Sequence, residues 1–273
     1  LAASVAQRSL ASSQDNYAQQ AERLATGLRI NKSSDDAAGM AISERLKNQA
    51  RGLNQAARNA QDGVSLIQTA EGAMGEAHNI LSRMRELAVQ ASNDTLTNTD
   101  RTNLLTEFTS LYAEIDRIAT STQFNGVAIL TGGSTAIKLQ IGANKDSSGD
   151  NLITLNITPA GGFQTTRLEA TMSAMGVTSQ SVANLAISTL DAAINAVSTA
   201  RTSIGSMQSR LESAGRSIAV ASENAAAANS RIADADIASS MSELVRAQIL
   251  QQAGISVLAQ ANQAPSLVLQ LLK

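Results

Sequence analysis

A heptad spacing of apolar residues recurs in three separate stretches of this chain and limits what it can fold into. In the first two stretches the apolar residues follow alternating steps of three and four. In the third, one returns at every seventh position beside a companion register. The residues are Ile67, Ala70, Met74, Ala77, Leu81, Met84, Ala88 and Ala91; Leu104, Phe108, Leu111, Ile115 and Ile118; and Ile187, Leu190, Ile194, Val197, Ile204, Leu211 and Ile218. Because such stripes can be buried only against other helices, the sequence predicts a long antiparallel helical rod or coiled-coil bundle.

The composition fits thin, closely packed helices better than a thick interior. Hydrophobic residues make up 43% of the 273 positions, but much of this is alanine, and aromatic residues are only 2%. Bulky aromatic side chains usually contribute to a large core. The net charge of −2 and the lack of Lys/Arg runs argue against nucleic acid and anionic membranes as partners.

Other sequence features exclude several kinds of site and segment. The chain has no cysteine, so disulfides and thiolate metal sites are excluded. No apolar run approaches the roughly 18–20 residues that span a bilayer, so membrane insertion is not expected. Arg8 and Asp15 interrupt the apolar pattern of the first residues, so this segment does not read as a secretory signal peptide.

Turn and capping signals divide the N-terminal half into helices. Leu10, Tyr17 and Leu24 recur at heptad spacing and predict a first helix that Gly27 interrupts. The polar residues 33–36 are N-cap candidates for a helix from Ala37 to about Ala91. Loop signals at 93–94 and 98–100 precede a further helix at about 101–120.

The pattern changes to a period of two near the middle of the chain. Asn125-Gly126 signals a turn, and apolar residues then alternate at 137–141 and again at 152–157, which predicts a β-hairpin at about 136–157. A helix is expected from near Ser181 to Ala228, followed by a polar break at 231–236. The last helix extends through Leu258, so the chain termini would pair as helices.

No residue combination indicates catalysis, a cofactor or a metal site. His78 is the single histidine, and no second histidine or cysteine accompanies it. Asp35 and Asp36 are better explained by N-capping than as a catalytic pair, and Asp234 and Asp236 similarly precede a helix. The serines lack a GxSxG motif or an activating base, so an enzyme is not expected.

Several strings in this order resemble bacterial flagellin, the subunit of the flagellar filament. They are ERLATGLRIN at 22–31, DDAAG at 35–39, RMRELAVQ at 83–90, TQFNGV at 122–127 and RAQILQQAGISVLAQANQ at 246–263. The resemblance covers essentially the whole chain. It implies a structural subunit that self-assembles into the filament for swimming motility, is extracellular, and is exported without a cleavable signal peptide.

The resemblance also implies a domain division. Segments 1–32 and 235–273 would be the two halves of a filament-core helical domain. Segment 33–180, including the hairpin, and the helix at 181–234 would form the neighbouring domain. Only 158 to about 179 separates the hairpin from the distal helix, so this would be a minimal form lacking the variable outer domains.

Partners follow from the same resemblance. They are many copies of the chain itself, a flagellar export chaperone, and the cap and junction proteins of the filament. Matching positions in the family are also recognised by the Toll-like innate flagellin receptor, here Arg83, Leu87, Gln90 and Glu107. The first three lie at i, i+4 and i+7 on one helix face. The plainer interpretation is that this face packs against the next subunit.

Apolar residues of the two terminal segments are the candidates for assembly. They are Leu10, Tyr17, Leu24, Leu28, Ile249, Leu250, Val257, Leu258, Leu269 and Leu272. We expect both segments to be largely disordered in the monomer and to order on assembly, because short isolated helices are marginal in water.

Two alternative functions remain open. One is a cell-surface flagellin homologue that binds an acidic glycan or host receptor. Its only obvious candidate binding residues are Lys138, Lys145 and Arg167 near the hairpin. Few aromatic residues are available as a sugar platform, which argues against it. The other is a hook-filament junction protein, which the string at 246–263 disfavours.

Overall fold

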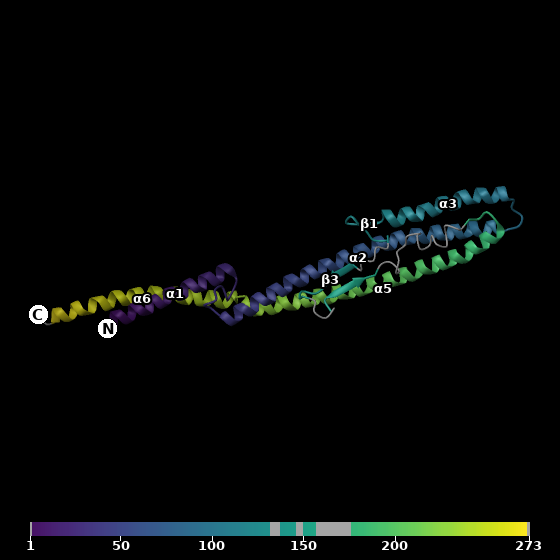
Figure 1. Ribbon diagram of the computed structural model, residues 1–273. Coiled ribbons are helices and arrows are strands. Elements are labelled where there is room, and N and C mark those ends of the chain that lie inside the picture. The colour runs from purple at the N-terminus through teal and green to yellow at the C-terminus, as the bar shows by residue number, and fades with distance from the viewer. Residues whose placement is uncertain (1, 132–136, 146–149, 157–175, 272–273) are drawn as a thin grey trace. The chain divides into compact units, whose positions relative to one another are not determined.

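The chain is mainly helical, as predicted. The computed structural model describes residues 2–131, 137–145, 150–156 and 176–271, and it gives the backbone alone for 2–3 and 262–271. The elements are α1 (Ala2–Thr26), α2 (Ala37–Ala91), α3 (Asn98–Ser121), β1 (Gln123–Phe124), β2 (Val127–Ala128), β3 (Ile137–Gln140), β4 (Leu152–Leu155), α5 (Gln180–Ala233) and α6 (Ile237–Leu271) (Figure 1). The bounds predicted for α2 are confirmed.

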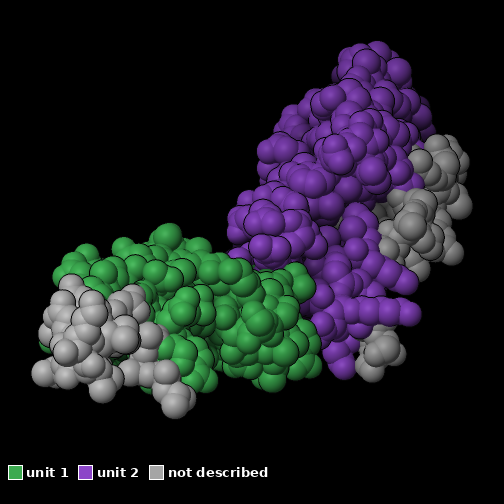
Figure 2. Space-filling model, turned by 90° about the vertical axis from the view of Figure 1, so that its left-hand side faces the viewer, with its two compact units in different colours: residues 1–50, 222–273 green, residues 51–221 purple. Residues whose placement is uncertain are grey.

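These elements form two compact units, which Figure 2 colours separately. Unit 1 comprises residues 1–50 and 222–273, and unit 2 comprises residues 51–221. Each unit therefore contains parts of both long helices, α2 and α5. Unit 1 adds the terminal helices α1 and α6, and unit 2 adds α3 and the strands.

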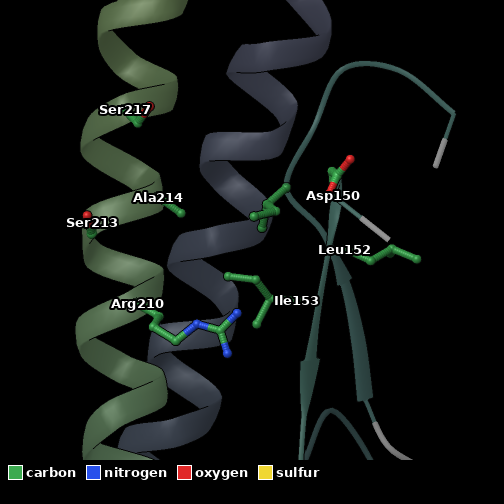
Figure 3. Close-up of a pocket in the computed structure, with 8 residues that line it drawn as sticks. Asp150, Leu152, Ile153, Arg210, Ser213, Ala214 and Ser217 are labelled. Carbon is green, nitrogen blue, oxygen red and sulfur yellow. The ribbon is translucent and has the colours of Figure 1, made fainter. Parts of the chain in front are cut away.

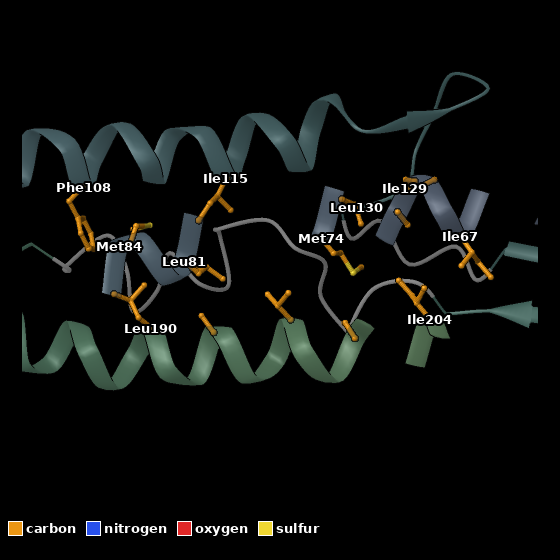
Figure 4. Close-up of a cluster of buried hydrophobic side chains, with 14 of the residues drawn as sticks. Ile67, Met74, Leu81, Met84, Phe108, Ile115, Ile129, Leu130, Leu190 and Ile204 are labelled. Atoms are coloured by element: carbon orange, nitrogen blue, oxygen red, sulfur yellow. The ribbon is translucent and has the colours of Figure 1, made fainter. Parts of the chain in front are cut away.

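The core of unit 2 consists largely of the predicted heptad positions. Every member of the α2 stripe from Ile67 to Ala91 is at most 3% exposed, and on α5 Leu190 and Ile204 are fully buried. Phe108 and Ile115 of α3 approach α2 from the side opposite α5 (Figure 4). α2 is thus the central helix of unit 2 and is covered by two others, which widens its buried face.

Cross-helix contacts give α2 and α5 an antiparallel register. Arg85 Nε lies 2.6 Å from Asp191 Oδ1, and Arg201 Nη2 lies 3.9 Å from Glu71 Oε1. α3 also runs antiparallel to α2, since Arg83 Nη2 lies 2.9 Å from Glu107 Oε1 and Arg101 Nε lies 2.9 Å from the Ala91 carbonyl. The predicted antiparallel bundle is therefore present in this unit.

α3 begins three residues earlier than the sequence pattern suggested. The residues Asn98 to Asp100, which were expected in a loop, form its first turn. Thr97 is the N-cap. Its hydroxyl accepts from the Asp100 N–H, and the Asp100 carboxylate accepts from the Thr97 N–H, which together form a capping box. The first N–H groups of a helix lack hydrogen-bond partners within the helix. The capping box supplies two such bonds, so it stabilises the start of α3 at Asn98.

The described residues of unit 2 form two hairpins, of which only the second was predicted as one. β1 and β2 join through Asn125 and Gly126, whose φ angles of 49° and 76° suit a tight hairpin turn. β3 and β4 pair antiparallel with Ile137 opposite Leu155. The predicted hairpin limits, 136 and 157, lie outside the described residues. Asn59 Nδ2 on α2 donates to the Gln140 carbonyl at 2.9 Å, which attaches this hairpin to α2.

In unit 1 the predicted end of the distal helix was wrong. α5 continues past Ala228 to Ala233, so the polar break is confined to 234–236. Side-chain contacts hold the extra turns, because Ser43 Oγ donates to Asn229 Oδ1 at 2.6 Å and Arg29 Nη2 donates to the Ile232 carbonyl at 2.7 Å. Helix propensity depends on the local sequence and does not include contacts with distant parts of the chain, so the last residues of α5 were not predicted to be helical.

Candidate assembly surface

A folded turn in unit 1 brings the two terminal segments together. Gly27 ends α1 with a φ of 69°, a left-handed conformation that glycine adopts without strain. Its carbonyl then accepts from the Ala235 N–H at 2.9 Å, and Leu28 bridges to Asp234. Asp236 caps α6, as predicted, by accepting from the N–H groups of Ala238 and Ser239 at 2.9 and 3.2 Å. The chain leaves this turn as two antiparallel helices.

Asp35 holds the connection between α1 and α2. Its carboxylate accepts from the N–H groups of Lys32 and Asn31, each at 3.0 Å. These bonds, that of Lys32 first, lower the pKa of Asp35 below its ordinary value. Asp36 caps α2 by accepting from the Gly39 N–H at 2.8 Å. The capping role inferred for this acidic pair is confirmed for Asp36.

α1 and α6 pack against each other. The predicted stripe of α1 is half-buried, and Leu10 lies against Gly254 of α6, where an added Cβ would be 3.3 Å from its Cδ1. Leu258 of α6 is half-buried too, as is Leu28 in the turn. One side of each terminal helix is therefore already occupied by the other helix.

The rest of α6 exposes a large apolar surface. Ile249, Leu250 and Val257 are 60%, 52% and 55% exposed. Four further apolar residues of this helix are about half exposed, namely Ile237, Met241, Val245 and Ile255. The side chain of Leu269 and all of Leu272 lie outside the described residues. A surface of this kind marks an interaction site in a water-soluble molecule.

A second candidate surface, on unit 2, contains the residues matched to innate-receptor recognition. Arg83 is half exposed and pairs with Glu107 and with Glu86, at 2.9 and 3.0 Å. These carboxylates, Glu107 first, raise the pKa of Arg83. Gln90 is exposed as well, but Leu87 is only 1% exposed and belongs to the core. A partner approaching this face would reach the ion pair and Gln90, not Leu87.

A cavity beside the β3–β4 hairpin has a mixed polar and apolar lining that indicates no particular ligand. It measures about 450 Å³ and lies between the hairpin and α5 (Figure 3). Arg210 extends from α5 toward the hairpin, and Ser213 and Ser217 line the same wall. Lys138 and Lys145 do not line it, and Arg167 lies outside the described residues.

The described residues offer little to catalysis or metal binding. They contain no cluster of three or more His, Cys, Asp or Glu side chains able to hold a metal ion. His78 is half-buried on α2, and its Nδ1 has no hydrogen-bond partner among them. No helix in the described part of the chain is long and apolar enough to cross a membrane.

Comparison with known proteins gives consistent matches. Residues 1–135 match the bacterial flagellin N-terminal helical region, and residues 187–272 match the bacterial flagellin C-terminal helical region. A flagellin of Halalkalibacterium halodurans is 49% identical over 252 residues, covering 92% of this chain and 90% of that protein. A flagellar filament 33 kDa core protein of Treponema phagedenis is 41% identical, covering 100% of this chain and 98% of its own.

Solved structures show the same similarity. The crystal structure of Bacillus cereus flagellin is 35% identical, with a TM-score of 0.50 over 59% of this chain and 88% of that one. A structure assigned as a flagellar hook-associated protein of Vibrio parahaemolyticus has a TM-score of 0.60 over 73% of this chain. At 15% identity, the second match concerns the fold alone.

Proposed function

The chain belongs to the bacterial flagellin family, and from this membership we propose that α1 and α6 are the segments that bury each subunit against its neighbours. As a flagellin, it is a structural subunit of the extracellular flagellar filament and not an enzyme. It corresponds to a minimal core form. The proposal concerns which residues perform the assembly.

The exposed apolar surface of α6 is the observation that carries the proposal. Burying a Leu, Ile or Val side chain fully contributes about 1.5–3 kcal/mol, so each half-exposed side chain still offers about 1 kcal/mol. The seven residues of this surface, Ile237 to Val257, together offer several kcal/mol per subunit. Neighbouring copies can supply this burial repeatedly along a filament, whereas a monomer leaves it unsatisfied.

The small core of unit 1 supports the same conclusion. Ile30 is its only large apolar side chain that is buried among the described residues, and the others are alanines, serines and Gly39. No described side chain of α1 is buried. Fixing a residue costs about 1–2 kcal/mol of backbone entropy, which so few contacts cannot offset. We therefore propose that 1–32 and 235–273 become ordered on assembly.

Seeded elongation of the purified protein tests this role. The full chain, added to filament fragments, is expected to extend them, and the chain trimmed to 33–234 is not, although circular dichroism should show that it remains helical. Chains trimmed at one end alone serve as controls for the contribution of each helix. Filaments grown from the doubly trimmed chain would contradict the proposal.

We further propose the partners that the family implies: an export chaperone, cap and junction proteins, and an innate receptor of the Toll-like class. For the receptor, the exposed Arg83–Glu107 ion pair is the supporting feature. Replacing Arg83 by alanine is expected to reduce receptor signalling by monomer, with Arg58→Ala, an exposed arginine elsewhere on α2, as the control. Unchanged signalling by the Arg83 variant would count against this contact.

A further inference from the structure

Unit 2 carries an excess of exposed positive charge around the β3–β4 hairpin. Arg51 and Arg58 are seven positions apart and so share one face of α2. The adjacent stripe of α2 is covered by the hairpin, since Ala143 lies against Gly52. The hairpin and α5 add further cations to this region. The basic patch comprises Arg51, Arg58, Lys138, Lys145, Arg210 and Arg216, all of them exposed.

The charge of the basic patch is not balanced by its surroundings. None of its side chains forms an ion pair within the part of the chain that the structure describes. The described carboxylates in this region are Asp62, one turn along α2 from Arg58, and Asp150 and Glu212. Six cations beside three carboxylates leave a net charge of +3.

The opposite charge predominates on α3 and the adjoining face of α2. Asp100, Glu107 and Glu114 recur at heptad spacing on one face of α3. Glu107 pairs with Arg83 of α2, which brings this face beside the α2 stripe that contains Glu76. The acidic strip comprises Glu76, Glu86, Asp100, Glu107 and Glu114, all at least partly exposed. Its cations are Arg83 and Arg117, so its net charge is −3.

The two surfaces are separated along α2 by a distance that a polymer can repeat. Glu86 lies 28 residues beyond Arg58, which at 1.5 Å per residue corresponds to about 42 Å. A parallel copy displaced by this distance would place its acidic strip beside the basic patch. Because the two surfaces differ, each such contact leaves one patch and one strip free. A contact of this kind continues from copy to copy and produces an open filament.

We propose that the basic patch of one copy binds the acidic strip of a second, parallel copy displaced by about 42 Å along α2. This contact rests on the assembly role proposed above. Two copies without the displacement would oppose patch to patch and strip to strip, and like charges across an interface disfavour that arrangement. The contact therefore sets the displacement between copies, which the apolar surface of α6 does not specify by charge.

Charge reversal tests the contact in the full chain. Arg51→Glu with Arg58→Glu, the patch variant, and Glu76→Lys with Glu86→Lys, the strip variant, each place like charges across the contact. Each is expected to raise the critical concentration for seeded elongation at least about tenfold. All four substitutions in one chain restore opposite charges and should return it to within about threefold of the unaltered value. The four side chains are exposed, so urea unfolding should show that each variant remains folded.

A charge-matched chain separates this contact from an effect of net charge. The patch variant with Glu44→Lys and Glu223→Lys, at exposed positions outside both surfaces, has the net charge of the four-substitution chain. It should elongate as poorly as the patch variant. Equal recovery in the two chains would overturn the contact. So would normal elongation by the patch variant, and loss of its binding to heparin beads would then assign the patch to an acidic polymer.

Cross-linking tests the displacement itself. The chain has no cysteine, so a short bismaleimide can join mixed filaments of Arg58→Cys and Glu86→Cys copies only at these positions. Dimers with one copy of each kind are expected. Dimers of like copies alone, or no dimers, would overturn the proposed displacement. If the unaltered chain fails to elongate seeds, the assembly role itself fails, and this contact fails with it.

Discussion

Arg101 shows how much one buried cation can organise in a helical protein. Its side chain is buried at the start of α3. Nη1 donates to Asn98 Oδ1 of α3 at 3.1 Å, and the other two bonds reach the end of α2 and the loop that follows it. Nε donates to the Ala91 carbonyl at 2.9 Å, and Nη2 donates to the Asn93 carbonyl at 3.0 Å. The carbonyls at a helix end lack intrahelical partners, so this guanidinium caps α2 and joins it to α3.

Replacing Arg101 by methionine is expected to lower the free energy of unfolding by about 2–3 kcal/mol, because the carbonyls of the buried Ala91 and of Asn93 lose a charged donor. Urea unfolding followed by circular dichroism measures this. Arg117→Met is the control, since Arg117 is exposed and pairs with Glu114 at the surface, and it should change stability by no more than about 0.5 kcal/mol. Similar values for the two variants would contradict the capping role.

Asp35 predicts a pH dependence at the α1–α2 connection. Its folded-state pKa lies below the ordinary value of about 3.9, because the backbone N–H groups of Lys32 and Asn31 bond the charged form. The stability that this charge contributes is therefore present above pH of about 4 and is lost as the pH falls through the folded pKa.

The variant Asp35→Asn should accordingly be less stable than the unaltered chain near pH 6, and the difference should shrink below pH of about 4. Urea midpoints of seeded filaments, in which segment 1–32 is ordered, test the prediction across this range, and the Asp35 ¹³Cγ chemical shift gives its pKa directly. A difference that grows as the pH falls would show that the sign assigned here is wrong.

The sequence predicted which residues are buried only where a helix packs against one neighbour through one face. The heptad members of α2 and the main register of α5, from Leu190 to Ile218, are buried as predicted, while the companion residues Ile187 and Ile194 are only half-buried. Leu87, grouped with Arg83 and Gln90 by helical spacing, is buried while the other two are exposed. α2 is covered by α3 as well as α5, so its buried face is wider than one seam. The burial of Arg101 could not be predicted from the sequence, because two of its hydrogen-bond partners are backbone carbonyls.

At the scale of elements, one glycine fixes how the β3–β4 hairpin attaches to the helices. Gly63 is buried on α2, where an added Cβ would collide with Leu139 of β3 and lie 3.1 Å from Leu211 Cδ1 of α5. The strand therefore approaches α2 because no side chain is present. The sequence pattern predicted the hairpin but not this contact, which depends on three elements at once.

Gly63→Ala is expected to destabilise the chain by about 1–3 kcal/mol through overpacking. Gly72→Ala, in the same helix, is the matched control, because an added Cβ there meets nothing within 4 Å. Alanine is the better helix former, so the control should gain up to about 1 kcal/mol. Opposite signs in urea unfolding are thus predicted, and a stabilised Gly63→Ala variant would disprove the close contact.

Substitutions on the exposed side of α6 are expected to prevent assembly without changing the stability of the monomer. Ile249→Ser with Val257→Ser alters side chains that are more than half exposed, so unfolding of the monomer should change by no more than about 0.5 kcal/mol. Seeded elongation should nevertheless be lost. Leu185→Ser, on a 69% exposed residue of α5, is the control and should elongate normally. Normal elongation by the double variant would remove this surface from the assembly interface.

Across the whole molecule, buried apolar residues are distributed unevenly between the two units. Unit 2 holds the continuous core from Val64 to Leu211, with aromatic and aliphatic side chains from three helices. The α1–α6 pair contributes only Ala247 and Ser240 to the buried residues among its described side chains. Local stability follows the density of buried apolar contacts, so the units should open independently of each other.

Hydrogen exchange measured by mass spectrometry can test this division in the full chain. In the monomer, amides of the buried α2 segment in unit 2 should be well protected, while those of α1 and α6 should exchange rapidly, because their pairing has almost no core. In seeded filaments, α1 and α6 should become protected by several orders of magnitude, since neighbouring copies then bury their outer surfaces. The protection of unit 2 serves as the internal control. Terminal helices already protected in the monomer would mean that their pairing is stable without neighbours, and ordering on assembly would then be wrong.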